Sequence, residues 1–327
     1  MKKILKLSAV LIVLLIVGAV GFLTYITKFL PNVPVEEVKI EYTPERIERG
    51  RYLANNVAQC VDCHSERDWS RFAGPIVPGS EGKGGEVFDR KMGLPGAIHT
   101  PNITPFHLKD WSDGELFRAI TAGVSKDGRP LFPIMPYPSF AKMDREDIYA
   151  IIAYLRTLPE IENKTPPSEL DFPMSVIVHT IPKKAEFTQK PSPVDKINYG
   201  AYLTNAASCI ECHTQMVRGQ LVEGKEFAGG RSFPLPDGSR VISSNITPDK
   251  ATGIGFWSEE LFIQRFKAYD KRVNAGAHQA VKPGDFNTIM PWTKYAEMTN
   301  EDLAAIFAYL QTLKPVSNKI GNTHVKP

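Results

Sequence analysis

Hydrophobic residues follow two different patterns along this chain. An uncharged run extends from Leu7 to Thr27, and elsewhere apolar residues recur at helical spacing between loops rich in glycine and proline. Two such stripes follow the i, i+3, i+4, i+7 pattern, at Ile148, Ile151, Ile152 and Leu155 and at Leu303, Ile306, Phe307 and Leu310. No alternating strand pattern of any length is visible. The patterns predict an all-α protein with few helices and long loops.

Capping residues mark where the predicted helices begin. Thr43 precedes Pro44, which favours the first helical position, and Asp144 and Thr299 precede the two apolar stripes. Ser112 and Glu115 have the spacing of a capping box. We therefore expect helices to start after each of these four capping positions.

The N-terminal apolar run predicts a membrane anchor over residues 1–30. Its 21 residues are enough to cross a hydrocarbon core at about 1.5 Å per residue. Three lysines precede the run and Lys28 alone follows it directly, which favours a cytoplasmic N-terminus and export of the remainder. A cleaved signal peptide is the alternative, with a shorter apolar region of about 7–15 residues. Both interpretations place the rest of the chain on the extracytoplasmic side of the inner membrane.

Composition narrows the class of protein. A length of 327 residues is compatible with about two domains, and 43% hydrophobic and 23% charged residues exclude wholesale disorder. A net charge of +3 provides no basic field for nucleic acid. The four cysteines occur in two copies of one short motif, so a disulfide scaffold is excluded.

The chain contains two copies of one unit, separated by about 150 residues. The recurring strings are Gly50-Arg51-Tyr52-Leu53 with Gly200-Ala201-Tyr202-Leu203, Asn102-Ile103-Thr104-Pro105 with Asn245-Ile246-Thr247-Pro248, Trp111-Ser112 with Trp257-Ser258, Ile134-Met135-Pro136 with Ile289-Met290-Pro291, and Ala153-Tyr154-Leu155 with Ala308-Tyr309-Leu310. We predict a first repeat over residues 43–158 and a second over 195–315. A proline-rich linker, 159–194, separates them, and a tail, 316–327, follows.

Both repeats carry a Cys-x-x-Cys-His motif. The motifs consist of Cys60, Cys63 and His64 in the first repeat and Cys209, Cys212 and His213 in the second. Two cysteines at this spacing bind the two vinyl groups of haem, and the following histidine can ligate the iron. A zinc site would need further Cys or His ligands, and a redox dithiol has no use for the histidine. The motifs predict two covalently bound haem c groups.

A second axial ligand must come from elsewhere in each repeat. The candidates in the first repeat and linker are Met92, Met135, Met143, Met174, His99, His107 and His179. Among the methionines, only Met135 and Met143 have counterparts, Met290 and Met298. Met143 and Met298 directly precede helix caps, where a core residue belongs. Met135 and Met290 lie between isoleucine and a rigid proline, and we predict them as iron ligands.

Other parts of the site have weaker signals. The ligating histidine usually donates its second ring N–H to a carbonyl group, which Gly74-Pro75 would supply in the first repeat, whereas the second repeat has Gly229-Gly230 in its place. Trp111, Trp257 and Arg129 are candidates for hydrogen bonds to haem propionates, with a core position the alternative for the tryptophans.

These motifs resemble the class I cytochrome c fold in duplicate. The chain is similar to membrane-anchored dihaem cytochromes and to cytochrome c subunits of bacterial membrane-bound alcohol, aldehyde and sugar dehydrogenases, over residues 43–315. The resemblance implies two tandem cytochrome c domains. It also implies that Gly50 and Gly200 let the first helix of each repeat cross the last, near Tyr154 and Tyr309.

The expected function is electron transfer and not catalysis. Iron with both axial positions occupied changes its charge and leaves no position for substrate. Electrons would pass from a periplasmic dehydrogenase or quinol to a terminal oxidase or soluble carrier. A dihaem cytochrome c peroxidase is the alternative, with His278 as its acid–base group. A haem sensor or assembly subunit is a third possibility, but no signalling domain is evident.

Overall fold

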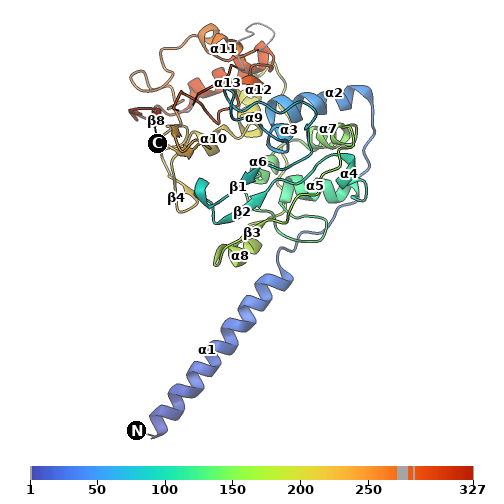
Figure 1. Cartoon of the computed structure of the whole chain (residues 1–327), viewed down its shortest axis with the longest axis vertical. Helices are drawn as coiled ribbons and strands as arrows, with labels where there is room; N and C mark the ends of the chain where they lie inside the picture. The colour runs from blue at the N-terminus through green and yellow to red at the C-terminus, as the bar shows by residue number, and fades with distance from the viewer. Residues whose placement is uncertain (1, 271–278, 283, 327) are drawn as a thin grey trace.

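The structure, a computed structural model, describes residues 2–270, 279–282 and 284–326. Helices make up most of its regular structure, which agrees in part with the all-α prediction, and one long helix stands apart from the globular part (Figure 1). The α-helices are α1 (Lys2–Phe29), α2 (Pro44–Tyr52), α3 (Cys60–Cys63), α4 (Pro105–Leu108), α5 (Asp113–Ala122), α6 (Tyr137–Phe140), α7 (Arg145–Leu155), α8 (Met174–Ile177), α9 (Lys196–Ala206), α10 (Cys209–Cys212), α11 (Glu259–Lys267), α12 (Trp292–Tyr295) and α13 (Asn300–Thr312). A π-helical turn, η1 (Leu53–Val57), continues α2, and two 3₁₀ turns are η2 (Arg90–Met92) and η3 (Val178–Thr180).

The helices begin where the capping residues predicted. Thr43 accepts a hydrogen bond from the Arg46 amide at the start of α2, and Thr299 accepts one from the Asp302 amide at the start of α13. Ser112 and Glu115 bond each other's backbone amides at the start of α5, which is the predicted capping box. Local sequence therefore determines where these helices start.

Short antiparallel strands are an addition to the prediction. They are β1 (Val87–Phe88), β2 (Gly96–His99), β3 (Glu169–Leu170), β4 (Met216–Val217), β5 (Gln220–Leu221), β6 (Ser232–Pro234), β7 (Arg240–Ile242) and β8 (His324–Val325). They form sheets in the orders β1-β2-β3, β4-β5 and β6-β7-β8, with Val87 opposite His99 and Phe233 opposite Val241. Strands of two to four residues are too short to show an alternating pattern in the sequence.

Helix α1 is the one described helix long and apolar enough to cross a membrane. Its side chains are exposed except for Ile26, near its C-terminal end. A helix that is apolar all round and unburied by its own protein requires an apolar environment. The structure therefore agrees with the predicted membrane anchor.

Each repeat is organised by a crossing of its first and last helices. Helix α2 packs on α7, and α9 packs on α13 in the same way. An added Cβ at Gly50 would overlap the carbonyl oxygen of Ala150, and one at Gly200 would overlap that of Ala305. The Cβ atoms of Tyr154 and Tyr309 lie next to these same positions. The close crossings implied by the resemblance are thus present.

The apolar stripes of α7 and α13 form the core. All eight stripe residues are buried, as are Met143 and Met298, which are 0% and 1% exposed. The two methionines thus have the core role expected of residues that precede a cap.

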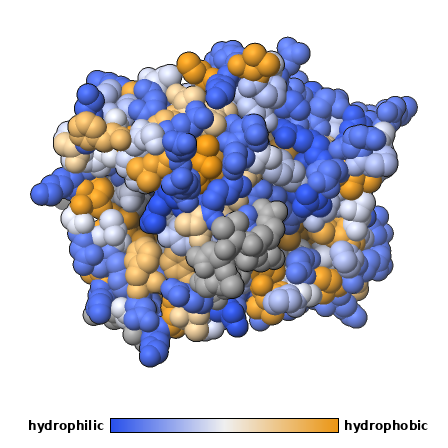
Figure 2. Space-filling model, turned by 90° about the horizontal axis from the view of Figure 1, so that it is seen from above, coloured by the Kyte–Doolittle hydropathy of each residue, from blue (hydrophilic) through white to orange (hydrophobic). Residues whose placement is uncertain are grey.

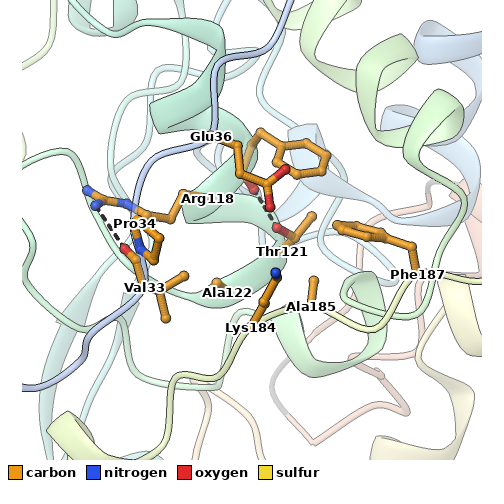
Figure 3. A pocket seen from close by; sticks show the side chains of 10 residues that line it. Val33, Pro34, Glu36, Arg118, Thr121, Ala122, Lys184, Ala185 and Phe187 are labelled. Atoms are coloured by element: carbon orange, nitrogen blue, oxygen red, sulfur yellow. Dashed lines mark hydrogen bonds between the residues drawn. The ribbon is translucent and has the colours of Figure 1, made fainter.

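The linker and the segment before α2 wrap around the first repeat. Strand β3 of the linker pairs with β2, and further along Phe187 stacks on Phe117 of α5. Figure 3 shows Phe187 and Lys184 facing Glu36 and α5 across a cavity of about 20 Å³. This cavity is too small for a substrate, so its role is packing.

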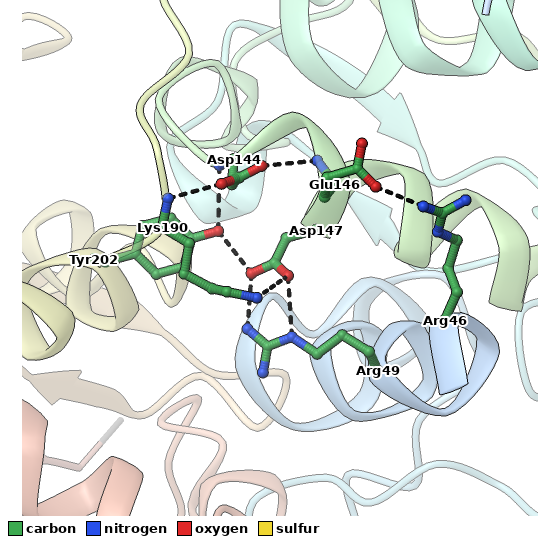
Figure 4. Close-up of polar contacts among 7 residues, drawn as sticks. All are labelled: Arg46, Arg49, Asp144, Glu146, Asp147, Lys190 and Tyr202. Carbon is green, nitrogen blue, oxygen red and sulfur yellow. Dashed lines mark hydrogen bonds and ion pairs between the residues drawn. The ribbon is translucent and has the colours of Figure 1, made fainter. Parts of the chain in front are cut away.

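The two repeats contact each other through reciprocal tyrosine–aspartate pairs. Tyr202 of the second repeat donates a hydrogen bond to Asp147 of the first at 2.7 Å (Figure 4), and Tyr52 donates to Asp302 at 2.6 Å. Each tyrosine oxygen also accepts from the backbone amide of the helix cap, Asp144 or Thr299, at 3.2 Å. Each repeat therefore helps to complete the start of the other's last helix.

Asp147 is the most heavily bonded member of this interface. It is 1% exposed and receives two hydrogen bonds from Arg49, at 3.0 and 2.7 Å, and one from Lys190 at 3.2 Å. Burial acts to raise the pKa of Asp147, but the bonds and charge of Arg49 hold it below its usual value. The carboxylate is therefore charged at neutral pH and stabilises the folded state.

We expect Gly50→Ala to destabilise the protein. In an exposed helix, replacing glycine by alanine increases the free energy of unfolding by up to about 1 kcal/mol. Here the overlap of the added Cβ with the Ala150 carbonyl should instead lower it by about 1–3 kcal/mol or more. Thermal unfolding of the haem-loaded protein measures the difference. Gly321→Ala, where an added Cβ meets no atom within 4 Å, is the control. Equal melting temperatures for the two variants would contradict the close crossing.

We expect Asp147→Asn to destabilise the protein by about 3 kcal/mol, because Arg49 loses its buried counter-charge. Because the folded-state pKa of Asp147 is lowered, its contribution is present above about pH 4 and lost as the pH falls below that value. Denaturant unfolding between pH 3 and 7 should therefore show a smaller pH dependence in the variant. Asp171→Asn, which breaks the exposed Arg90–Asp171 pair, should change little.

Candidate functional site

The two cysteine pairs lie on single helical turns of the same shape. Helices α3 and α10 begin and end on the cysteines, so Sγ-bearing residues three apart lie on one face of the turn. In both repeats the preceding residue has a left-handed backbone, with φ 55° at Gln59 and 53° at Ser208. This geometry brings the chain sharply into the motif, and sequence reasoning missed it because neither residue is a glycine.

The four cysteines differ in exposure according to their place in the motif. Cys60 and Cys209 are half-buried, whereas Cys63 and Cys212 are exposed, and no disulfide joins them. Desolvation raises the pKa of Cys60, Cys63 and Cys209 to about 12 and raises that of Cys212 as well. A nucleophilic redox dithiol has a lowered thiol pKa, so the direction of these shifts does not favour that role.

The two motif histidines are oriented in the same way. Nδ1 of His64 lies 2.8 Å from the Pro101 carbonyl oxygen, and Nδ1 of His213 lies 2.8 Å from that of Ser244. Since a carbonyl can only accept, each Nδ1 carries the proton and each Nε2 keeps its lone pair. Burial lowers the pKa of both imidazoles, which favours the neutral, ligating form.

The prediction that Gly74-Pro75 supplies the carbonyl acceptor for His64 is wrong. The Gly74 carbonyl instead accepts from the Arg67 side chain, and the residues before the Asn-Ile-Thr-Pro strings supply the acceptors. The physical reason is register: Gly229-Gly230 corresponds to Gly84-Gly85, because the amides of Gly84 and Gly229 bond the carbonyls of His64 and His213. The recurrence of Asn-Ile-Thr-Pro was the sequence signal for the acceptor loop.

The Asn-Ile-Thr-Pro strings hold these acceptor loops in place. The Asn102 side chain accepts from the amide and hydroxyl of Thr104 and donates to the Ile161 carbonyl at 2.8 Å. Asn245 makes the same bonds to Thr247 and Val316. Each asparagine thus ties the loop that orients the histidine to the chain that follows the last helix.

Met135 and Met290 occupy equivalent places beside the core. Both are half-buried, and each carbonyl accepts a hydrogen bond at 2.7 Å from the amide two residues on, at Tyr137 or Trp292. The intervening prolines, Pro136 and Pro291, act as the caps of α6 and α12. Unlike Met143 and Met298, these two residues are not fully enclosed by the core.

The remaining candidates lie in other settings. The His107 ring is tilted by 51° against that of Trp111, and His179 bonds the Leu30 carbonyl at 2.9 Å beside α1. Trp111 and Trp257 pack at the edge of the hydrophobic core, which agrees with their alternative role. Arg129 pairs with Asp127 at 3.8 Å on the surface near α1. His278 lies outside the described residues.

The donor set fits haem c better than a bare metal ion. Two thiols three residues apart, an imidazole with a free Nε2 and a thioether recur in both repeats. Within the described part of the chain, no group of three or more His, Cys, Asp or Glu residues could hold a metal ion. A zinc site therefore has no support.

Known proteins similar to this chain include several cytochromes. The cytochrome c subunit of a quinone alcohol dehydrogenase from Gluconacetobacter polyoxogenes is 29% identical, over 86% of this chain and 58% of its own length. The cytochrome c subunit of gluconate 2-dehydrogenase from Pantoea cypripedii is 27% identical, over 82% of this chain and 59% of its own length. A "Diheme cytochrome c-type" protein from Cereibacter sphaeroides is 26% identical, over 95% and 99%.

No protein-family model matches the chain. The chain spans just under three-fifths of the length of the alcohol dehydrogenase subunit it matches, but nearly all of the dihaem cytochrome. These relatives support haem c and electron transport, and they lend no support to a peroxidase. In its motifs, its helical fold and its relatives, the chain resembles the dihaem c-type cytochromes and the cytochrome c subunits of bacterial dehydrogenases.

Proposed function

We propose that this chain is an electron-transfer cytochrome with two tandem cytochrome c domains, residues 43–158 and 195–315. Residues 1–30 anchor it in the cytoplasmic membrane, and the linker 159–194 and the tail 316–327 complete it. The observation that carries the proposal is the pair of equivalent histidines, each with Nδ1 bonded to a loop carbonyl and Nε2 free.

Each domain would hold one haem c through its own residues. Cys60 and Cys63 would form the thioether bonds in the first domain, and His64 and Met135 would take the two axial positions. In the second domain the corresponding residues are Cys209, Cys212, His213 and Met290. Haem supplies one-electron redox chemistry, while the protein supplies ligation, burial and fixed placement.

The chain would act as a carrier rather than as a catalyst. Two protein ligands on each iron would leave no position for oxygen, peroxide or substrate. We propose that electrons come from a periplasmic dehydrogenase or from membrane quinol and go to an oxidase or soluble carrier. The names of the relatives favour a dehydrogenase subunit as the donor. The domains would lie on the extracytoplasmic side, following the lysine asymmetry.

The haem stoichiometry provides the first test. Intact mass spectrometry of the full chain should show the mass of two haems, and Cys60→Ala with Cys63→Ala should remove one of them. Cys209→Ala with Cys212→Ala should remove the other. A mass with fewer than two haems in the unsubstituted protein would contradict the proposal.

The axial methionines provide the second test. We expect Met135→Ala and Met290→Ala each to lower the reduction potential of one haem by on the order of 100 mV, because the soft thioether stabilises ferrous iron. Redox titration with absorbance spectra measures this, and each variant should also bind carbon monoxide at one iron. Met92→Ala, which lies outside the repeated setting, is the control. Carbon monoxide binding by the unsubstituted protein would contradict closed coordination.

A further inference from the structure

A short part of the linker lies against the outer end of the predicted membrane span. Helix α8 and turn η3 both contact α1, and the His179 side chain bonds the Leu30 carbonyl at 2.9 Å. In Figure 1, α8 lies at the end of the globular part from which α1 leaves. This segment, residues 172–180, is therefore placed by its contacts with α1.

The height of these contacts along α1 can be compared with the thickness of a bilayer. The apolar run Leu7–Thr27 is about 30 Å long as a helix, which matches the hydrocarbon core. Ile26, the one α1 residue that the protein buries, lies at the outer end of this run. A segment packed beside the end of α1 therefore lies at the boundary between hydrocarbon and headgroups.

Two hydrophobic side chains of the segment are exposed. Phe172, just before α8, is 79% exposed, and Ile177, at the end of α8, is 43% exposed. Val178 of the same segment is buried, and Met174 and Val176 are half-buried, so Phe172 and Ile177 are its exposed large hydrophobic side chains. Tyr25 and Phe29, also exposed, lie at the same end of α1. Aromatic residues at this level are typical of a membrane interface.

Charge next to the segment fits the headgroup region. A hollow of about 390 Å³ is lined by Lys28, Arg129 and His179 together with Asp127. Asp127 pairs with Arg129 at 3.8 Å, so one lysine charge remains in excess. A basic side chain beside exposed aromatic residues complements anionic phospholipid headgroups.

We propose that residues 172–180 dip into the outer leaflet of the bilayer as a second membrane contact, with Phe172 and Ile177 among the acyl chains. This inference rests on the proposed anchoring by α1. Helix α1 alone, followed by a loop, would let the globular part tilt relative to the membrane. A second contact through residues 172–180 would fix this tilt. The binding partner of this segment is the lipid bilayer itself.

The end of the molecule opposite to α1 has a more hydrophilic surface. Seen from that end, in Figure 2, hydrophilic residues cover most of the visible described surface, and hydrophobic ones are scattered among them. Phe256, which precedes α11 at that end, is 76% exposed and thus matches Phe172 in residue type and exposure. Leu261 of α11, 47% exposed, matches Ile177 in the same way.

Photo-crosslinking of the full haem-loaded chain in nanodiscs of phosphatidylethanolamine and phosphatidylglycerol tests the proposal. p-Benzoylphenylalanine would replace Phe172, Phe256 or, within α1, Phe22, and mass spectrometry would detect covalent phospholipid adducts. We expect phospholipid adducts at positions 22 and 172 and no adducts at position 256. Ile177→Asp should reduce the adduct at position 172, whereas Leu261→Asp should leave it unchanged.

The possible failures are distinguishable. Adducts at position 22 without adducts at position 172 would overturn the second contact and leave the anchor standing. Absence of adducts at position 22 would overturn anchoring by α1 and, with it, this inference. Equal adduct yields at positions 172 and 256 would show nonspecific contact and would also overturn the proposal.

Discussion

The hydrogen bond from a histidine Nδ1 to a loop carbonyl is the interaction on which each repeat depends. It fixes the imidazole tautomer and leaves Nε2 directed away from the loop. The acceptor loop is in turn held by Asn102 or Asn245, whose amide reaches the chain beyond the last helix. A small residue is needed where Gly84 or Gly229 meets this loop, because an added Cβ would overlap it. The orientation of one ring is thus determined by segments from the whole repeat.

Much of this organisation follows from local sequence. Capping residues such as Thr43 and Ser112 defined the helix starts, and the position of Met143 directly before a helix cap distinguished this core residue from Met135. Comparing the two copies was the useful step, since a feature kept twice in one chain is constrained twice. The four cysteines and two histidines lie in matching geometry for the same reason.

Features that depend on distant segments were not predictable in this way. The acceptor for His64 is Pro101, in a loop 37 residues further along the chain. Insertions between the repeats hid the fact that Gly229 corresponds to Gly84 rather than to Gly74. The sequence did not predict the hydrogen bond from Tyr52 to Asp302, because a tyrosine on an apolar helix face is ordinarily a core residue. Strands of two or three residues form only because the surrounding loops bring them together.

The crossed pairing of Tyr52 with Asp302 and Tyr202 with Asp147 has a consequence for the symmetry of the interface. When residue i of one unit contacts residue j of the other and the reverse also holds, the arrangement has the form of a twofold-symmetric homodimer interface within a single chain. This symmetry is incomplete, because Arg49 bonds Asp147 at one junction whereas Tyr199 occupies the corresponding position beside Asp302 at the other. The two carboxylates therefore have different surroundings, although each accepts a hydrogen bond from a tyrosine of the opposite repeat.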